Sequence, residues 1–369
     1  LIAALLAATE EQPSAKTKDA NPWPLRSIHH CGQLPATTLA QHTGAHLARW
    51  LTQLPPNVLN PGSYRRAVAG LARAYGWKAD TYDERRLRRL GAGAFLAVTA
   101  ASARRDAAIV RVSYRPRGRS RRSPVALIGK GLCFDTGGLN LKTAGSMLSM
   151  HSDMAGSAVA LGTLVALTEA GYPHPVDAWL VLAENRIGPE AYTQQDVIKA
   201  LNGKTVQIVH TDAEGRMVLA DALALAARAR PAAIIDFATL TGACVSALTE
   251  RMSGFFTNRE SLELVAEEAG RICGERMHGF PMPDDFDEDL DSATADVAQC
   301  LIGGKGDHIY AARFLNHFVP STIPWLHCDL SSAERPGGLA HVPHTITGFG
   351  VRFAATLLNS PEFLRLTAP

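Results

Sequence analysis

The feature that most constrains this chain is an alternation of β-rich and helical segments that begins near residue 107. Apolar, β-branched runs predict strands, and runs with apolar residues three and four positions apart predict helices. The alternating order predicts an α/β fold, in which a central, largely parallel mixed sheet is flanked by helices. The predicted strands are 107–114, 124–130, 176–183, 205–210, 232–240 and 323–330, and the predicted helices are 37–53, 63–75, 156–172, 218–230, 261–277 and 309–319.

The charge balance restricts the classes of partner. The 369 residues include 37 basic and 35 acidic ones, so the net charge of +2 gives no reason to expect nucleic acid. Two arginine clusters, 84–90 and 115–122, are interpreted as solvated surface, with a charged partner as the alternative. The apolar stretch 1–8 is too short to span a membrane, which takes roughly 20 residues, and 1–36 is predicted to be irregular.

The cysteines are scattered and form no CxxC motif, which speaks against a zinc ribbon or a thioredoxin-like site. A chain of this size does not need disulfides for stability. We therefore expect reduced thiols and a cytoplasmic location. The residues concerned are Cys31, Cys133, Cys244, Cys273, Cys300 and Cys328.

Charged residues follow two of the predicted strands. The stretch "GKGLCFDTGGLNLK" (129–142) ends one strand with two lysines and an aspartate, and "HTDAEGR" (210–216) follows another. In α/β sheets, ligands bind at the carboxyl ends of strands. Gly137 and Gly138 are predicted to turn the chain tightly, so that Asp135 and Lys142 face one point.

Helix capping offers a simpler interpretation of two of these residues. Asp153 and Asp212 each precede a predicted helix, where aspartate is a favoured cap and is stabilised by the helix dipole. Capping does not explain Glu214 and Arg216. It does not explain Lys130 either, because an unpaired lysine at the end of a buried strand is costly.

Charge arithmetic favours a metal site instead. Asp135, Asp153, Asp212 and Glu214 carry four negative charges together, which two divalent ions would balance. Two metals about 3.5–4 Å apart are a common arrangement for hydrolysing amides and phosphoesters. Oxygen ligands suit Mn²⁺ or Mg²⁺, and one nitrogen donor extends the choice to Zn²⁺ or Co²⁺. None of the 13 histidines lies in an HExxH motif.

The same strings resemble the signatures of the leucine aminopeptidase (cytosol aminopeptidase) family. That family's pattern reads roughly K-G-x-x-x-D-[ST]-G-G-x-x-x-K, then D-M-x-G-[AS]-A, then N-T-D-A-E-G-R, and the spacing here is the same. The resemblance runs from about residue 40 to the C-terminus. It implies a zinc-peptidase-like catalytic aminopeptidase domain over 51–369, preceded by an N-terminal remnant and linker helix over 1–50. Relatives carry a separate N-terminal domain that is much longer.

The resemblance also implies a set of metal ligands for two divalent ions, Mn²⁺ or Zn²⁺. Lys130, Asp135, Asp153 and Glu214 would hold one ion. Asp135, Asp212 (with its backbone carbonyl) and Glu214 would hold the other, so that Asp135 and Glu214 bridge the two. We expect Lys130 to bind as a neutral amine, because two nearby cations oppose an ammonium charge.

Catalytic and substrate residues follow from the same comparison. Lys142 would polarise the scissile carbonyl, and Arg216 would position a bicarbonate that acts as general base. His210 stands where relatives usually carry asparagine, next to Asp212. The positions that line the substrate pocket in relatives suggest a preference for an apolar N-terminal residue, and they are Met150, Thr239, Leu240 and Gly242.

The expected activity is therefore leucyl-type removal of the N-terminal residue of peptides. Relatives are homohexamers, and we expect the same assembly here, with no membrane partner. Another dinuclear hydrolase, such as a phosphoesterase, is one alternative. A second is an additional DNA-binding role, since some bacterial relatives act as regulators, although the near-zero net charge makes nucleic acid an unlikely partner.

Overall fold

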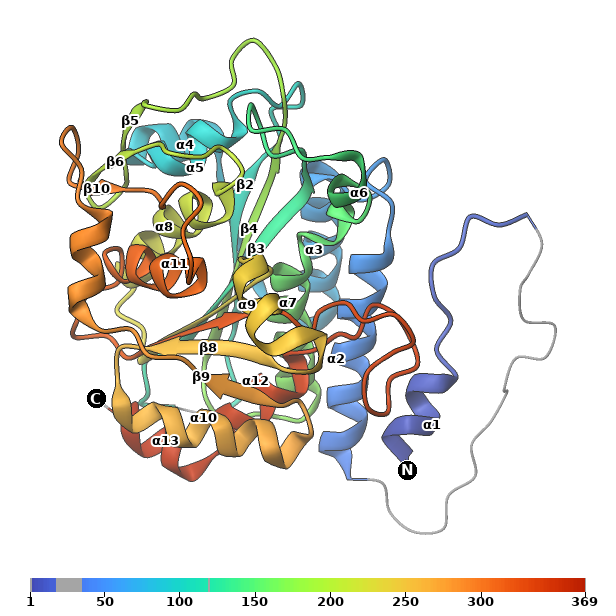
Figure 1. Cartoon of the computed structure of the whole chain (residues 1–369). Coiled ribbons are helices and arrows are strands. Elements are labelled where there is room, and N and C mark those ends of the chain that lie inside the picture. Colours follow the sequence, from blue (N-terminus) through green and yellow to red (C-terminus); the bar gives the residue numbers. More distant parts are fainter. Residues whose placement is uncertain (1, 18–34, 119, 369) are drawn as a thin grey trace.

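A computed structural model describes residues 2–17, 35–118 and 120–368 of the chain. An eight-stranded sheet runs through the molecule in the order β1-β2-β4-β3-β7-β11-β8-β9 (Figure 1). Its strands are β1 (Lys78–Asp83), β2 (Ala108–Tyr114), β3 (Val125–Asp135), β4 (Val176–Asn185), β7 (Ala233–Ala238), β8 (Ser253–Thr257), β9 (Met277–Gly279) and β11 (Trp325–Asp329).

The central part of the sheet is parallel. β3 pairs in parallel with β4 and β7, and β7 pairs in parallel with β11, whereas β1, β2 and β8 add antiparallel pairings. β4 is buried along its whole length and β3 along nearly all of it, as their continuous apolar runs predict for strands covered on both faces. The predicted α/β class with a mixed, largely parallel sheet is confirmed.

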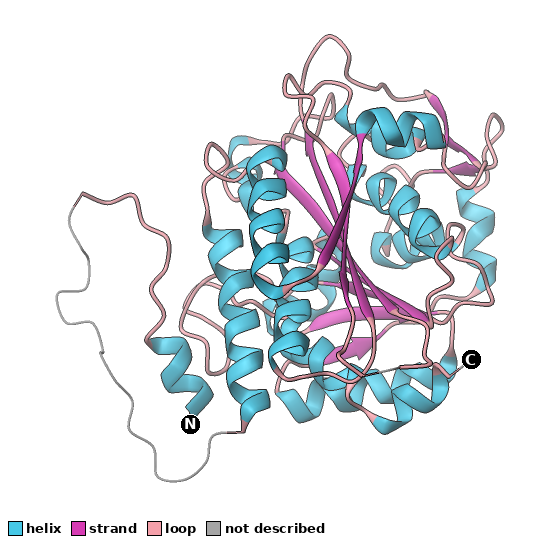
Figure 2. Cartoon of the chain, turned by 180° about the vertical axis from the view of Figure 1, so that it is seen from behind, coloured by secondary structure: helices cyan, strands magenta, loops and turns pink. Residues whose placement is uncertain are grey.

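Helices cover both faces of the sheet (Figure 2). α7 lies between the sheet and two further helices, α2 and α12, so almost every residue of α7 is buried and it is apolar all round. On this face lie α2 (Ala36–Gln53), α3 (Pro61–Tyr75), α7 (Ala155–Glu169), α10 (Glu260–Cys273), α12 (Val351–Leu358) and α13 (Pro361–Leu366). On the other lie α4 (Glu84–Leu90), α5 (Gly93–Thr99), α8 (Glu214–Ala227) and α11 (Asp307–Asn316).

Several predicted segments differ from the structure in extent or place. The predicted strand 205–210 is only β6 (Thr205–Gln207), which pairs with β5 (Val197–Lys199) and β10 (Val297–Ala298) in a separate small sheet. The predicted helix 218–230 begins earlier, at Glu214. Part of the supposedly irregular N-terminus is a helix, α1 (Ile2–Ala8), because its apolar side packs on α2.

Two further expectations concern reduced cysteine thiols and the absence of a membrane-spanning segment. The five described cysteines are all unpaired and buried, and Cys31 lies outside the described residues. In the described part of the chain, no helix combines the length and apolar character that crossing a bilayer requires.

A buried carboxylate joins three elements on the face of the sheet that α8 covers. Asp221 of α8 accepts hydrogen bonds from the backbone N–H of Phe95 at 2.8 Å and from that of Leu201 at 2.7 Å. Phe95 lies in the first turn of α5, whose N-cap residue Ala92 offers no side-chain cap. Asp221 therefore satisfies N–H groups that would otherwise be buried without a partner.

We predict that Asp221→Ala lowers the free energy of unfolding by about 2–4 kcal/mol, because it leaves two buried N–H groups without acceptors. Urea unfolding followed by circular dichroism measures the change. The control is Asp291→Ala, which removes an aspartate that lies in a loop and should leave stability nearly unchanged. Equal midpoints for Asp221→Ala and the parent protein would contradict the role of Asp221.

Stability should also depend on pH through Asp221. Burial raises the pKa of Asp221 from its ordinary value of 3.8 to about 7. Between these values the folded state keeps a proton that the unfolded state has released, so this contribution to stability falls as pH rises from about 4 to about 7. We expect the stability difference between the parent protein and Asp221→Ala to narrow across that window in urea titrations. A constant difference would show that the carboxyl group does not titrate on unfolding.

Candidate active site

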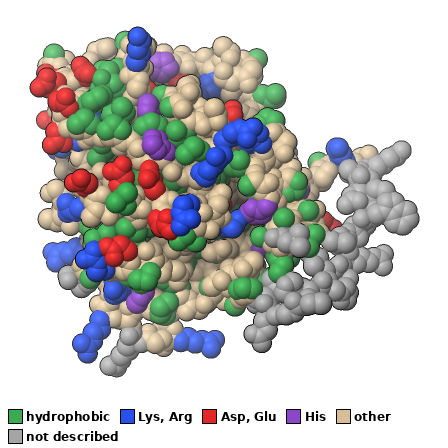
Figure 3. Space-filling view, turned by 60° about the horizontal axis from the view of Figure 1, so that its bottom comes forward, with side chains coloured by type: hydrophobic (Ala, Val, Ile, Leu, Met, Phe, Trp, Pro, Cys, Tyr) green, Lys and Arg blue, Asp and Glu red, His purple; other side chains and the backbone are tan. Residues whose placement is uncertain are grey.

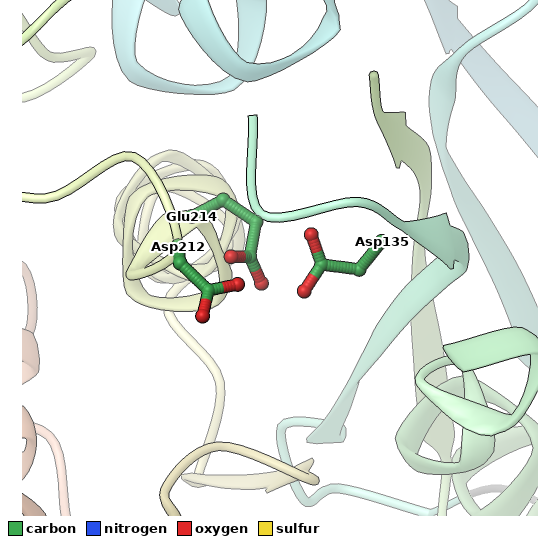
Figure 4. Close-up of side chains that lie close together, drawn as sticks. All are labelled: Asp135, Asp212 and Glu214. Atoms are coloured by element: carbon green, nitrogen blue, oxygen red, sulfur yellow. The ribbon is translucent and has the colours of Figure 1, made fainter. Parts of the chain in front are cut away.

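Four carboxylates from three segments of the chain meet at one place. Asp135 ends β3, Asp153 follows the short 3₁₀-helix Met150–Ser152, and Asp212 and Glu214 lie at the start of α8. We call these four residues the acidic cluster. One carboxylate oxygen each from Asp135, Asp212 and Glu214 lies within 4.8 Å of the other two, and the three side chains point toward one another (Figure 4).

Lys130 reaches the acidic cluster from the interior of β3. Its side chain is only 4% exposed, and its Nζ lies 2.8 Å from Asp153 Oδ1 and 3.2 Å from Glu214 Oε1. Nζ also donates a hydrogen bond to the carbonyl oxygen of Thr239 at 3.0 Å. The amine therefore lies within contact distance of two members of the cluster.

Lys142 approaches the cluster from the opposite side. Its Nζ lies 3.0 Å from Asp135 Oδ2 and 2.5 Å from Asp212 Oδ1. Gly137 and Gly138 have φ angles of 86° and 65°, a left-handed conformation that favours glycine, and they turn the chain between Asp135 and Lys142. The predicted tight turn at the two glycines is confirmed.

The electrostatics of the cluster are those of a crowded set of like charges. Burial, with the charge of Asp135, raises the pKa of Glu214 to about 8, and burial also raises the pKa values of Asp153 and Asp212. Burial lowers the pKa of Lys130, but Asp153 and Glu214 outweigh it and hold that pKa above its ordinary value. The cluster therefore has more negative charge than its surroundings balance easily.

The chemistry of the donors fits divalent cations. Buried carboxylate oxygens of Asp153 (Oδ2) and Glu214 (Oε2) have no hydrogen-bond partner among the described residues. Buried carboxylates without donors carry a free-energy penalty that cations relieve. Oxygen donors with one amine suit Mn²⁺ or Zn²⁺. Which residues bind which ion stays a prediction.

A cavity of about 310 Å³ opens over the acidic cluster. The predicted substrate residues Met150, Thr239, Leu240 and Gly242 lie on its walls, together with both lysines. Arg216 instead lines an adjoining cavity of about 360 Å³. The structure thus brings the predicted ligand and substrate residues around one space, and it places Arg216 beside that space. The two cavities share Lys142, Asp212, Glu214, Leu240, Thr241 and Gly242.

Comparison with known proteins shows to which family the chain belongs. The family model of the cytosol aminopeptidase catalytic domain matches residues 46–355. The chain belongs to the cytosol aminopeptidase family. The probable cytosol aminopeptidase of Stutzerimonas stutzeri (strain A1501) is 42% identical over 298 residues, which cover 80% of this chain and 59% of the relative. That of Parasynechococcus marenigrum (strain WH8102) is 38% identical over 343 residues, which cover 89% of this chain and 69% of the relative.

Solved structures show the same fold. The bottromycin maturation enzyme BotP in complex with Mn superposes with a TM-score of 0.88 at 34% sequence identity, covering 98% of this chain and 79% of that one. The family resemblance seen in the sequence is confirmed. This member of the cytosol aminopeptidase family spans 57% to 69% of the length of the curated relatives it matches.

Sequence reasoning missed residues that position the acidic cluster in this family member. Asn185, at the end of β4, is buried and donates hydrogen bonds to Asp135 Oδ1 at 2.9 Å and to the carbonyl oxygen of Thr211 at 3.1 Å. The hydroxyl of Tyr192 donates to the same carbonyl at 2.7 Å. A polar residue at the end of an apolar run was the available signal, but the predicted strand stopped at residue 183.

Asp329 is a supporting carboxylate that sequence reasoning also missed. It accepts hydrogen bonds from the N–H groups of Leu240 and Thr241 and, at 2.7 Å, from the hydroxyl of Thr241. These contacts fix the segment 239–242 that walls both cavities. Asp329 lies at the end of β11, so the strand-end rule applied to the other carboxylates would have found it.

His210 takes part in positioning the cluster as well. Its Nδ1 accepts a hydrogen bond from the backbone N–H of Asp212 at 3.3 Å. A side-chain acceptor two residues before the N–H is the arrangement that asparagine makes in turns. The histidine at this position therefore supplies the local contact that an asparagine could make there.

We predict that Thr239→Val weakens Mn²⁺ binding about 10–100-fold, because Thr239 Oγ1 donates to Asp153 Oδ1 at 2.7 Å and orients that carboxylate. Valine keeps the shape and the carbonyl that Lys130 contacts. Calorimetric titration with Mn²⁺ measures the affinity. Thr163→Val is the matched control, since the Thr163 hydroxyl is buried in α7 with no partner among the described residues. Unchanged affinity in Thr239→Val would contradict this positioning.

Proposed function

We propose that this chain is a metal-dependent leucyl-type aminopeptidase that hydrolyses the N-terminal residue of peptides. The observation that carries the proposal is the meeting of the acidic cluster with Lys130 and Lys142 at one cavity. Membership of the cytosol aminopeptidase family supports the same activity.

Two divalent ions, Mn²⁺ or Zn²⁺, are proposed as the resident metals of the acidic cluster. Bound there, they would supply a water molecule of lowered pKa and polarise the peptide carbonyl. Asp135 and Glu214 would be shared by the two ions, with Asp153 and Lys130 completing the donors to one ion and Asp212 those to the other. Lys130 must release the proton that Asp153 and Glu214 stabilise before its amine can be a ligand.

Lys142 is proposed to stabilise the negative charge that develops on the carbonyl oxygen. Burial lowers the pKa of Lys142, but Asp135 and Asp212 raise it more, so the ammonium stays charged. A preorganised cation beside the reacting carbonyl contributes most in a site from which water is excluded. Its contacts with Asp135 and Asp212 hold it at the rim of the cluster.

Arg216 is proposed to hold the anion that accepts a proton during the reaction. The family resemblance implies that this anion is bicarbonate, which stays a prediction. The guanidinium of Arg216 already contacts an anionic group, because Nη2 lies 2.8 Å from both carboxylate oxygens of Asp307. We therefore assign no step to bicarbonate.

The substrate is proposed to be a peptide with an apolar N-terminal side chain. Met150 and Leu240 give the cavity apolar walls close to the acidic cluster. The cavity volume of about 310 Å³ suits one amino-acid residue and part of the next.

A cytoplasmic homohexamer is the proposed state, from the family resemblance and the names of the relatives. A nucleic-acid partner is not proposed. Arg86 and Arg115, one from each arginine cluster, pair with Asp80 at 2.6 Å and with Asp177 at 2.9 Å. Basic and acidic side chains are interspersed over the face seen in Figure 3.

The activity is tested by comparing two substrates on the Mn²⁺-loaded and Zn²⁺-loaded protein. We expect turnover of leucine p-nitroanilide and none of p-nitrophenyl phosphate. Cleavage of the phosphate ester alone would favour the other dinuclear hydrolase, and no turnover of either substrate would overturn the proposal.

Replacing Lys142 separates its role from metal binding. We predict that Lys142→Met lowers kcat about 10²–10³-fold, because the developing charge loses its cation, while two metal ions per chain remain bound. Turnover of leucine p-nitroanilide and metal analysis measure the two effects. Lys78→Met, on the exposed start of β1, is the control. A variant that loses its metals in step with its activity would assign Lys142 to metal binding instead.

A further inference from the structure

Arg216 has a counter-ion of its own within the chain. It lies in the first turn of α8 with its side chain 3% exposed, and its Nη1 donates to the carbonyl oxygen of Gln299 at 3.2 Å. Its Nη2 contacts both carboxylate oxygens of Asp307 at 2.8 Å. The side chain of Asp307 is 35% exposed, so the buried guanidinium of Arg216 is paired with a partly solvated carboxylate.

The pair lies beside the acidic cluster. Asp307 lines the cavity of about 360 Å³ that shares Lys142, Asp212 and Glu214 with the substrate cavity. Asp307 is the first residue of α11, and α11 packs against α8. The packing of these two helices therefore holds the carboxylate next to the place where the reaction is proposed to occur.

The reaction requires a proton acceptor that is not a metal ligand. Among the described residues that line this second cavity, Asp307 is the carboxylate outside the proposed ligand set. The lysines and Arg216 are cations, and His210 uses Nδ1 to accept the backbone N–H of Asp212. Asp307 combines an oxygen base with partial access to solvent.

We propose that Asp307 is the proton acceptor of the peptidase reaction and occupies, on Arg216, the place that bicarbonate would take. The inference rests on the proposed aminopeptidase function. As the attacking water adds to the carbonyl carbon, its O–H bond breaks and the proton passes through cavity water to a carboxylate oxygen of Asp307. When the C–N bond breaks, Asp307 returns that proton to the leaving amine, so that one water is added across the amide and Asp307 is regenerated.

Nη2 of Arg216 is already paired with the Asp307 carboxylate, and Nε is buried without a hydrogen-bond partner among the described residues. Bicarbonate at Nη2 would lie against the Asp307 carboxylate, and like charges at such short range repel each other. Turnover should therefore be independent of added bicarbonate. Removing the carboxylate should expose the guanidinium and create the dependence.

Two variants test this assignment. Asp307→Gly opens the space on Arg216, and Asp307→Asn fills it without a base. In buffer depleted of carbon dioxide, with leucine p-nitroanilide and Mn²⁺, we expect no response of the parent protein to bicarbonate. Both variants should lose about 10²-fold or more in kcat, and bicarbonate should restore part of the activity of Asp307→Gly only.

A binding measurement gives a readout apart from activity. Calorimetric titration with sodium bicarbonate should show binding to Asp307→Gly and none to the parent protein or to Asp307→Asn. Asp287→Asn is the matched control, because Asp287 makes a two-point contact with Arg313, another mostly buried arginine, away from both cavities. Thermal unfolding shows that each variant compared is folded.

Three outcomes would overturn the assignment of Asp307. They are bicarbonate stimulation of the parent protein equal to that of Asp307→Gly, bicarbonate binding to the parent with equal affinity, and full kcat of Asp307→Gly without bicarbonate. If the parent cleaves no peptide substrate, the proposed function fails. The titration with bicarbonate then still decides whether Asp307 occupies the anion site on Arg216.

Discussion

Mutual repulsion among four crowded carboxylates, three of them buried, is the constraint on which the rest of this structure depends. Two like charges about 4 Å apart cost roughly 4 kcal/mol at the effective dielectric constant typical of proteins. In the acidic cluster, carboxylate oxygens of Asp135, Asp212 and Glu214 lie within 4.8 Å of one another, and the cluster is held together by two lysines, by Asn185 and by the hydroxyl of Thr239. Only a rigid support can maintain that arrangement. β3 provides it, because it is paired on both edges and covered on both faces.

The overall class of the fold could be predicted because its signal is local. Apolar runs such as β3 and β4 are buried on both faces, so the sequence itself records their position in the centre of the sheet. β6 could not be placed, because a three-residue strand carries too little pattern and one of its two partners, β10, comes from a segment far along the chain. β8 was missed for a related reason, since its short run is interrupted by a glycine.

The residues of the candidate site could likewise be predicted only where their signal is local in the sequence. Three members of the acidic cluster lie in two short strings, 129–142 and 210–216, and Asp153 lies in a third segment, so the residues converge once β3, α8 and the segment before α7 are adjacent. The partner of Arg216 could not be predicted, because Asp307 is 91 residues further along the chain and the contact depends on how α11 packs on α8. Nothing in the spacing of the motifs marks Asp307 as different from an ordinary first residue of a helix.

Thr239 connects two properties that protein engineers usually treat as separate. The Thr239 hydroxyl donates a hydrogen bond to Asp153, and its carbonyl oxygen accepts one from Lys130. The next residue, Leu240, lines the proposed substrate cavity. A change of backbone at this point moves a proposed ion ligand and a pocket wall together. Redesigning this chain to accept a bulkier N-terminal side chain by altering the 239–242 segment would therefore also disturb metal binding at the proposed site.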